Sequence, residues 1–317
     1  MAAPLLLSEQ TAAQRACLKR RLEALQRTFD RSFLGTDPLA LVHAYRAPAD
    51  QEIAGFVASG LAFGNVVAIQ ASVSAVLEAM GPSPAEFVDR FDAERDEARL
   101  VGLYHRWIRG RDLLLLAGTL QRMRRESGSL RAFFLQGHRT EDADTGRVLA
   151  SFSERARSLA AAMSPAGAGR RATVVPFFPS PRDGSACKRL NLFLRWMVRG
   201  GDGLDLGLWP EVPRRQLVLP LDTHLVRLSR ALGLTKRKSP GWAMAVEATR
   251  SLALLDPQDP VKYDFSLCRL GILDLCLHGR DPIDCRRCPP PRARLRRHGR
   301  LRQSVPLRGN TPARRPC

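Results

Sequence analysis

Apolar residues recur every three to four positions along most of the chain, which is the spacing of one face of an α-helix. Strict alternation of apolar and polar residues, the pattern of a half-buried strand, is almost absent, and so are the turn dipeptides of β-hairpins. We therefore expect an all-α protein. The periodic segments predict helices at residues 9–33, 50–63, 66–79, 92–108, 111–126, 142–163, 186–199, 223–232, 239–254 and 260–276.

One long stretch, residues 53–77, contains no charged side chain. A membrane-spanning helix needs about 20 predominantly apolar residues, so this stretch raises that alternative. Gly60, Gly64, Asn65 and Gln70 interrupt it, however. The interruptions favour two buried helices in a protein that does not enter the membrane.

The segment Ser-Pro-Ala-Gly-Ala-Gly-Arg-Arg-Ala, at residues 164–172, has the composition of a flexible connector. We expect an N-terminal helical lobe over residues 1–170 and a second lobe over residues 171–288. After Cys288 the chain is rich in Pro, Arg and Gly and has no apolar period. Such a sequence cannot bury enough surface to offset its ordering entropy, so residues 289–317 are predicted to be a disordered basic tail.

The 317 residues carry a formal net charge of +19. A charge of this size favours a polyanionic partner, either a nucleic acid or an acidic membrane surface. Eleven arginines and no acidic residue fall within residues 285–317, so nineteen minus eleven leaves +8 for residues 1–284. The body of the protein is therefore basic without its tail.

The seven cysteines are odd in number and scattered along the chain. The start of the chain, Met-Ala-Ala-Pro-Leu-Leu-Leu, has neither a basic region nor an apolar run long enough for export. These features predict a reducing, cytoplasmic location and no disulfide framework.

Lys188 lies at the end of the segment Pro-Ser-Pro-Arg-Asp-Gly-Ser-Ala-Cys-Lys, residues 179–188. If Ser185 caps the following helix, Lys188 occupies its first turn. The positive end of the helix dipole and the adjacent Arg189 would then favour the neutral amine, which is the nucleophilic form. A solvated lysine on an amphipathic helix is the alternative. The core-facing stripe of this helix would consist of Leu190, Phe193, Leu194 and Met197.

Asp222 stands before a second helix, where Leu221 and Val226 are spaced as a hydrophobic staple and Gly233 ends the helical pattern. A carboxylate here can stabilise positive charge at a sugar carbon or accept a proton from an attacking amine. Helix capping alone also explains an aspartate at this place.

Together these two segments resemble the helix-hairpin-helix DNA glycosylase superfamily, in which a hairpin containing Pro and Gly precedes a catalytic lysine and a later Leu-Asp-Thr-His segment supplies an aspartate. The phrase Leu-Asp-Thr-His-Leu-Val-Arg, residues 221–227, resembles endonuclease III relatives. The separation of 34 residues between Lys188 and Asp222 is similar to that of the archaeal 8-oxoguanine glycosylases. The phrases Ser-Ala-Cys-Lys-Arg-Leu-Asn (185–191), Leu-Ala-Phe-Gly-Asn (61–65) and Tyr-Asp-Phe-Ser-Leu-Cys (263–268) resemble an uncharacterised bacterial family related to these enzymes.

The resemblance implies a two-lobed glycosylase fold and a base-excision repair enzyme with both DNA glycosylase and AP lyase activity. Lys188 would form a Schiff base with the sugar of a flipped nucleotide in double-stranded DNA, with Asp222 assisting, and the substrate would be an oxidised purine such as 8-oxoguanine. The implied enzyme is a monomer that needs no cofactor and associates with the bacterial nucleoid when bound to DNA. A non-catalytic helix-hairpin-helix DNA-binding protein is the alternative. The residues expected to contact DNA are Pro179, Ser180, Gly184, Ser185, Arg189, His224 and Arg227.

Further arginines and aromatic residues near these motifs are open to two interpretations. Arg195 and Arg230 are candidates for phosphate contacts, although arginines on helices also serve as solvated surface charges. The aromatic residues near the motifs can stack on a flipped base or belong to the core. These are Phe177, Phe178, Trp196 and Trp209.

Cys276, Cys285 and Cys288 resemble the start of the iron–sulfur loop that follows the last helices of many endonuclease III relatives. The next cysteine is Cys317, far from the other three, so a regular four-thiolate cluster lacks its fourth ligand. A degenerate iron–sulfur site, a zinc site completed by His278 and three free thiols remain alternatives.

Overall fold

The protein was analysed as a computed structural model, which describes residues 5–163 and 172–272. Within these residues the structure is mostly helical, so the all-α class predicted from periodicity is confirmed. The α-helices are α1 (Ala12–Thr28), α2 (Leu39–Val42), α3 (Pro48–Gly60), α4 (Val66–Met80), α5 (Pro84–Asp89), α6 (Glu97–Leu100), α7 (Gly110–Ser127), α8 (Leu130–Leu135), α9 (Gly146–Ala161), α10 (Lys188–Val198), α11 (Thr223–Ala231), α12 (Trp242–Ala253) and α13 (Asp264–Ile272). Four 3-10 turns accompany them, namely η1 (Leu7–Glu9), η2 (Arg31–Thr36), η3 (Pro181–Asp183) and η4 (Arg214–Gln216).

The helix predicted over residues 92–108 is wrong. Asp92 Oδ1 accepts hydrogen bonds from the backbone amides of Glu94 and Arg95, and such local bonds compete with helix formation. Only the short α6 forms before the chain turns into a hairpin of β1 (Tyr104–His105) and β2 (Ile108–Arg109), whose turn places Arg106 at a φ of 55°. The other predicted helices are present with shifted ends, and the part of the last one beyond residue 272 lies outside the described residues.

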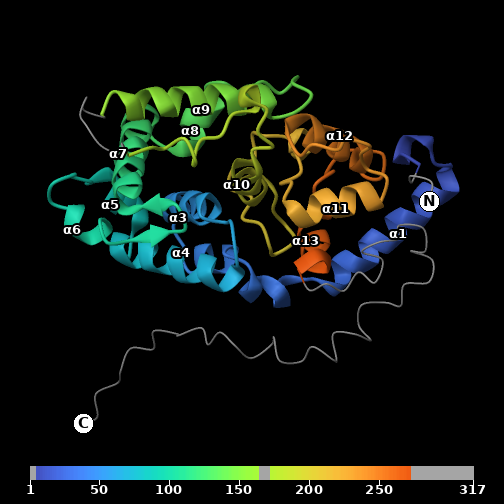
Figure 1. Cartoon of the computed structure of the whole chain (residues 1–317), viewed down its shortest axis with the longest axis horizontal. Helices are drawn as coiled ribbons and strands as arrows, with labels where there is room; N and C mark the ends of the chain where they lie inside the picture. Colours follow the sequence, from blue (N-terminus) through green and yellow to red (C-terminus); the bar gives the residue numbers. More distant parts are fainter. Residues whose placement is uncertain (1–4, 164–171, 273–317) are drawn as a thin grey trace, which may run out of the picture.

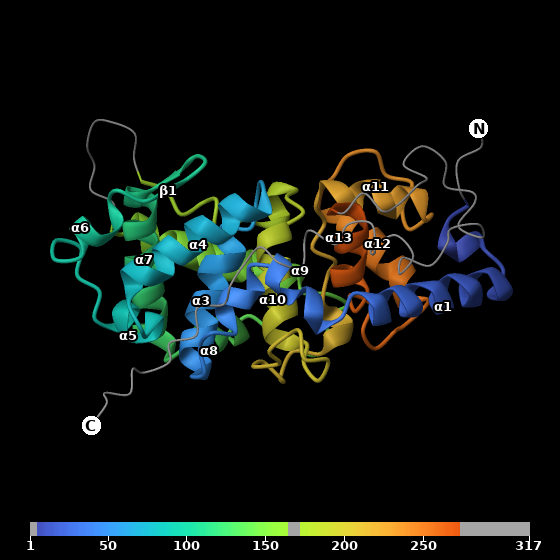
Figure 2. The same ribbon diagram turned by 90° about the horizontal axis from the view of Figure 1, so that it is seen from below.

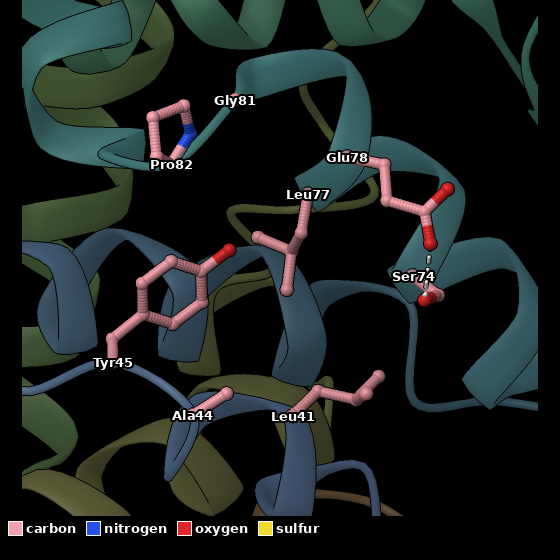
Figure 3. A pocket seen from close by; sticks show the side chains of 8 residues that line it. All are labelled: Leu41, Ala44, Tyr45, Ser74, Leu77, Glu78, Gly81 and Pro82. Carbon is pink, nitrogen blue, oxygen red and sulfur yellow. Dashed lines mark hydrogen bonds between the residues drawn. The ribbon is translucent and has the colours of Figure 1, made fainter. Parts of the chain in front are cut away.

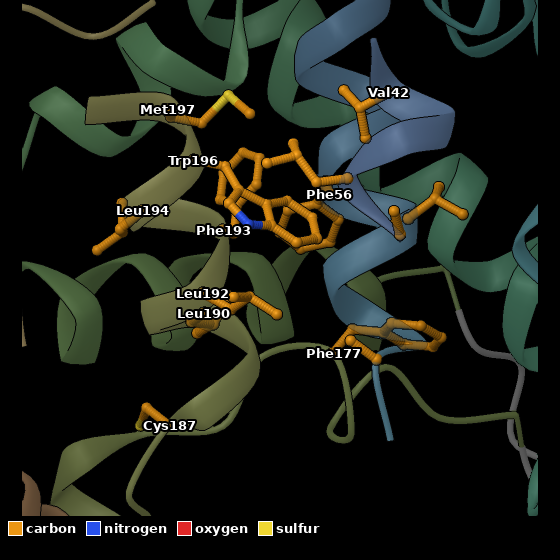
Figure 4. Close-up of a cluster of buried hydrophobic side chains, with 14 of the residues drawn as sticks. Val42, Phe56, Phe177, Cys187, Leu190, Leu192, Phe193, Leu194, Trp196 and Met197 are labelled. Carbon is orange, nitrogen blue, oxygen red and sulfur yellow. The ribbon is translucent and has the colours of Figure 1, made fainter. Parts of the chain in front are cut away.

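Helix α10 runs through the middle of the molecule and packs against α3 (Figures 1 and 2). All four residues of its predicted apolar stripe are buried, as is Phe56 of α3. The ring of Phe56 meets that of Phe193 at a centroid distance of 5.2 Å (Figure 4). The ring of Phe178 lies at the same distance from it. This aromatic core fixes the position of α10 and therefore of the residues at its N-terminal end.

The helices form two groups on either side of α10. Helices α3 to α9 lie on one side, and α11 to α13 lie on the other (Figure 1). Helix α1 belongs with the second group, because it packs along α13 and the backbone amide of Leu7 donates to the carbonyl of Gly233. The segment at which we expect the lobe boundary is outside the described residues, as is the predicted basic tail.

The uncharged stretch at residues 53–77 forms α3 and α4, the two helices expected from its interruptions. In the described residues, no helix has both the length and the apolar character required to cross a membrane.

Candidate active-site cavity

A cavity of about 830 Å³ lies where α10, α11 and α13 meet the loop between α3 and α4. Lys188 and Asp222, which are 34 positions apart in the sequence, both line it. Lys188 is the first residue of α10, and Asp222 immediately precedes α11. The fold thus brings the two predicted catalytic residues to one concave site.

The start of α10 differs from the sequence prediction. Ser185 does not cap this helix, because α10 begins only at Lys188; the Ser185 hydroxyl accepts a hydrogen bond from the amide of Cys187 in the turn before it. Cys187 is the N-cap residue, with a left-handed φ of 48° and no side-chain capping bond. The amides of the first turn of α10 are therefore left without a capping side chain beside the cavity.

The Lys188 side chain reaches across to the end of α3. Its Nζ donates a hydrogen bond of 2.7 Å to the carbonyl oxygen of Ala62. The neighbouring Arg189 is bound in a similar way, because its Nη1 donates to the carbonyl of Gly60 at 2.9 Å. Carbonyl groups at a helix C-terminus carry partial negative charge and attract cations. Both cationic side chains are thus held at one wall of the cavity.

Arg189 is enclosed more than a surface arginine would be. Its guanidinium lies 5.0 Å from the centroid of the Phe63 ring. Burial lowers the pKa of Arg189 to about 10. The side chain lines the cavity, so an incoming anionic group would meet it there.

Asp222 is the N-cap of α11, as predicted. Its Oδ1 accepts a hydrogen bond of 2.7 Å from the amide of Leu225, and Leu221 of the predicted staple is buried. Its Oδ2 lies 3.7 Å from the thiol of Cys268 on α13. Burial raises the pKa of Cys268 to about 12, and the Asp222 carboxylate adds to the shift. At neutral pH the thiol is therefore protonated and can donate to Asp222.

The hairpin before α10 is a 3-10 turn, η3, that ends at Gly184 with a φ of 73°. The carbonyl of Gly184 accepts from the amide of Trp242, and a Cβ added at Gly241 would lie 2.8 Å from that carbonyl oxygen. The hairpin is thus docked onto the start of α12. Among its predicted DNA-binding residues, Pro179 and Ser185 line the cavity, whereas Gly184 is exposed beside it. Ser180 is buried and its Oγ accepts from the amide of Arg182, so that side chain serves the turn.

The candidates on α11 divide between the cavity and the surface. His224 lines the cavity and packs against α13 at Gly271, where an added Cβ would lie 2.7 Å from that of His224. Arg227 is exposed on the same helix, outside the cavity lining. Arg230 donates to the backbone carbonyls of Arg237 and Lys238, so it holds the loop after the helix.

Arg195 is not available to a phosphate. Its side chain is only 2% exposed and forms ion pairs with Asp205 and Asp264. Burial alone would lower the pKa of Arg195. These two carboxylates outweigh burial and hold that pKa above its usual range. Sequence periodicity placed this arginine on α10 but could not show its acidic partners, which are Asp205 in the loop after the helix and Asp264, 69 positions away.

A second ion pair lies among the residues that line the cavity. Arg269 of α13 donates to Oδ2 of Asp37 at 2.6 Å, and both residues line the cavity. Because Arg195 pairs with Asp264 and Arg269 pairs with Asp37, these four charges largely neutralise one another.

The four aromatic residues proposed as base-stacking candidates belong to the core. Phe177, Phe178, Trp196 and Trp209 are each at most 1% exposed. The aromatic lining of the cavity comes instead from Phe63 and Trp107, whose rings stack at a centroid distance of 4.3 Å. Trp107 lies on the β1–β2 hairpin, where a helix was predicted, so its place beside Phe63 was not expected.

The expected metal ligands Cys276, Cys285 and Cys288 lie outside the described residues, as do His278 and Cys317. In the ranges 5–163 and 172–272, no group of three or more His, Cys, Asp or Glu side chains is arranged to hold a metal ion.

A smaller cavity of about 420 Å³ lies between α2 and α4 (Figure 3). Its lining is mostly apolar, apart from Tyr45, Ser74 and Glu78, and the last two are hydrogen-bonded to each other at 3.0 Å. This lining offers no counterpart of the lysine and aspartate of the larger cavity.

Comparison with known proteins gives one result. The model of a family described as "Protein of unknown function (DUF2400)" matches residues 37–273, a range that contains every cavity-lining residue except Thr36. No curated protein and no solved structure shows a match. Because the matched range covers most of its length, the chain belongs to the DUF2400 family.

Proposed function

We propose that this protein is a base-excision repair DNA glycosylase with AP lyase activity. The observation that carries the proposal is that Lys188 and Asp222, on separate helices, line one cavity of about 830 Å³. Ligand cavities commonly measure about 300–1,000 Å³, so this one is large enough for a nucleoside turned out of a duplex. The motif resemblance supports the same reaction class.

In this reaction the Lys188 amine forms a bond to C1′ of the flipped nucleotide as the glycosidic bond breaks and the base leaves with the bonding electron pair. Opening of the sugar ring gives a protonated Schiff base between Nζ and C1′. Loss of a proton from C2′ then expels the 3′ phosphate and nicks the strand. The amine must first leave the Ala62 carbonyl, which is 2.7 Å away.

Asp222 serves the same step as a base and an electrostatic partner. One carboxylate oxygen is engaged in capping α11, which fixes the group in place. The other oxygen can accept the proton released from the attacking amine, or stabilise positive charge that develops at C1′.

The start of α10 and the hairpin before it form the proposed DNA contact. Uncapped amides at a helix N-terminus bind phosphate oxygens, and those of α10 border the cavity. Arg189 at the wall and the exposed Arg227 add positive charge. The net charge of +8 over residues 1–284 is consistent with binding to a duplex.

An oxidised purine such as 8-oxoguanine is the substrate we propose, by resemblance to the archaeal enzymes. The stacked rings of Phe63 and Trp107 support a base as the bound group, because aromatic side chains stack on nucleobases.

The alternative is a helix-hairpin-helix protein that binds DNA without cleaving it. One contact favours it: Lys188 donates to a backbone carbonyl of its own protein, which is a sufficient structural role for this side chain.

Base release and strand cleavage on an 8-oxoguanine duplex, measured beside duplex binding, separate the two functions. An enzyme would release base and nick the strand, and Lys188→Gln would remove both activities while retaining binding. Lys236→Gln, the same change at an exposed lysine outside the cavity lining, should retain all three. If wild-type protein binds the duplex but acts on no lesion, the non-catalytic function replaces our proposal.

A further inference from the structure

Asp264, the first residue of α13, has one carboxylate oxygen without a partner. Its Oδ2 accepts from Arg195, whereas Oδ1 is buried and has no hydrogen-bond donor among the described residues. The residue is 2% exposed and lines the same cavity as Lys188 and Asp222. Asp264 therefore contributes an acceptor that the protein itself does not satisfy.

Such an oxygen is unusual, because buried polar atoms nearly always have a hydrogen-bond partner. An unsatisfied buried acceptor destabilises the folded protein, and the cost is larger when the acceptor is charged. The ion pair with Arg195 holds the carboxylate in place, so it cannot turn away to find another donor. A donor brought by a ligand would remove this cost.

We propose that Asp264 is a specificity-determining residue of the cavity, accepting a hydrogen bond from an N–H group on the flipped base. This inference rests on the proposed glycosylase function and extends it to the chemistry of the base. A guanine-type base offers N1–H and a 2-amino group on one edge, and either can donate to Oδ1. An adenine-type base carries only its 6-amino donor on that edge, beside an unprotonated N1 acceptor that would be repelled by a carboxylate oxygen placed for N1–H.

Replacing Asp264 with asparagine changes the hydrogen-bonding group that the protein presents to the base. Arg195 can only donate hydrogen bonds, so the amide oxygen of the asparagine would face Arg195. The NH2 group would then take the place of Oδ1. The variant thus converts an acceptor into a donor at nearly constant volume.

The test compares two substrates that differ in whether a base is present. Asp264→Asn should excise 8-oxoguanine about 10- to 100-fold more slowly, the cost of an unmatched hydrogen bond. Schiff-base formation on a preformed abasic site, which has no base to recognise, should stay within about twofold of wild type. An equal loss on both substrates, or no loss on either, would overturn the assignment.

A matched control is Asp205→Asn. Asp205 is also buried and also bonded to Arg195, but it does not line the cavity. It should affect thermal stability without changing the ratio of the two activities. If Asp205→Asn changed that ratio as much as Asp264→Asn does, the effect would belong to Arg195 and the assignment would be wrong.

The wild-type protein gives a measurement that does not depend on a variant folding. It should excise 8-oxoguanine at least about tenfold faster than 8-oxoadenine, which is the discrimination expected from one hydrogen bond. Equal rates would overturn the assignment while leaving the glycosylase function standing. Absence of both base excision and abasic-site trapping would instead overturn the proposed function, and this assignment with it.

Discussion

The thiol of Cys268 lies 3.7 Å from Oδ2 of Asp222, which is the carboxylate oxygen that does not cap α11. Cys268 belongs to α13, which packs against α11. The contact therefore links the proposed catalytic carboxylate to the helix that carries Asp264. Both oxygens of Asp222 have a neighbour, so the orientation of this side chain is defined before any substrate binds.

Removing the thiol should reduce activity through the orientation of Asp222. We expect Cys268→Ala to lower the single-turnover rate of base excision about three- to tenfold, the loss of a weak hydrogen bond of ~1 kcal/mol. Cys268→Ser supplies a hydroxyl donor and should restore most of the rate. A serine variant as slow as the alanine variant would show that packing, and not the hydrogen bond, explains the effect.

Asp222 has two roles that two substitutions can separate. Asparagine caps a helix about as well as aspartate, so Asp222→Asn should leave the free energy of unfolding within about 0.5 kcal/mol of wild type. Base excision should nevertheless fall about 100-fold or more, as for loss of a general base. Asp222→Ala should lose both activity and about 0.5–2 kcal/mol of stability. Urea unfolding and single-turnover assays measure the two quantities, and wild-type activity in Asp222→Asn would exclude the catalytic role.

The buried thiols predict a specific alkaline response. Burial raises the pKa of Cys268 to about 12, against 9.0 for a free thiol. The folded protein therefore keeps a proton that the unfolded chain releases, so this group's contribution to stability is complete below about pH 9 and is lost as pH rises toward 12. The wild-type free energy of unfolding should fall more steeply between pH 8.5 and 10.5 than that of Cys268→Ser.

Alkylation provides a second measure of the same property. Burial also raises the pKa of Cys187 to about 12. Because the thiolate is the reactive form, iodoacetamide should modify Cys187 and Cys268 of the folded protein slowly at pH 8. Cys17 on α1 is more accessible than Cys187 and should react faster. Peptide mapping by mass spectrometry measures the three rates, and rapid labelling of Cys268 would contradict its environment in the structure.

Trp107 should contribute to DNA binding more than to stability, because it is 50% exposed and lines the cavity beside Phe63. Stacking of a base on an aromatic side chain contributes about 1–3 kcal/mol, so Trp107→Ala should weaken binding to a lesion-containing duplex about tenfold or more. Tyr104→Ala is the control, because Tyr104 is an exposed aromatic residue of the same hairpin that does not line the cavity. Equal losses in the two variants, measured by fluorescence anisotropy, would argue against stacking.

Local patterns predicted most of the helices, the N-cap position of Asp222 and the buried face of α10. The capping of α11 by Asp222 and the buried stripe of α10 depend on neighbours within a few positions, which a sequence displays directly. The start of α10 differs from the prediction because Cys187 adopts a left-handed φ of 48°, so that the helix begins at Lys188. A positive φ at a residue other than glycine is not visible in the residue types.

Features that depend on distant segments could not be predicted in this way. Arg195 looked like a surface cation because its partner Asp264 is 69 positions away. The stacking of Phe63 on Trp107 depends on the β1–β2 hairpin, which stands where the end of a helix was predicted. Placement of Lys188 and Asp222 in one cavity likewise required the packing of α10, α11 and α13.

Borohydride trapping on a duplex with a single abasic site, followed by peptide mapping of the adduct, tests the central role of Lys188 most directly. Reduction converts a Schiff base into a stable bond between the lysine Nζ and C1′. We predict a covalent adduct that maps to Lys188, persists in Lys236→Gln and is absent from Lys188→Gln. An adduct of undiminished yield in Lys188→Gln, or one that maps to another amine, would contradict the assignment of Lys188 as the nucleophile.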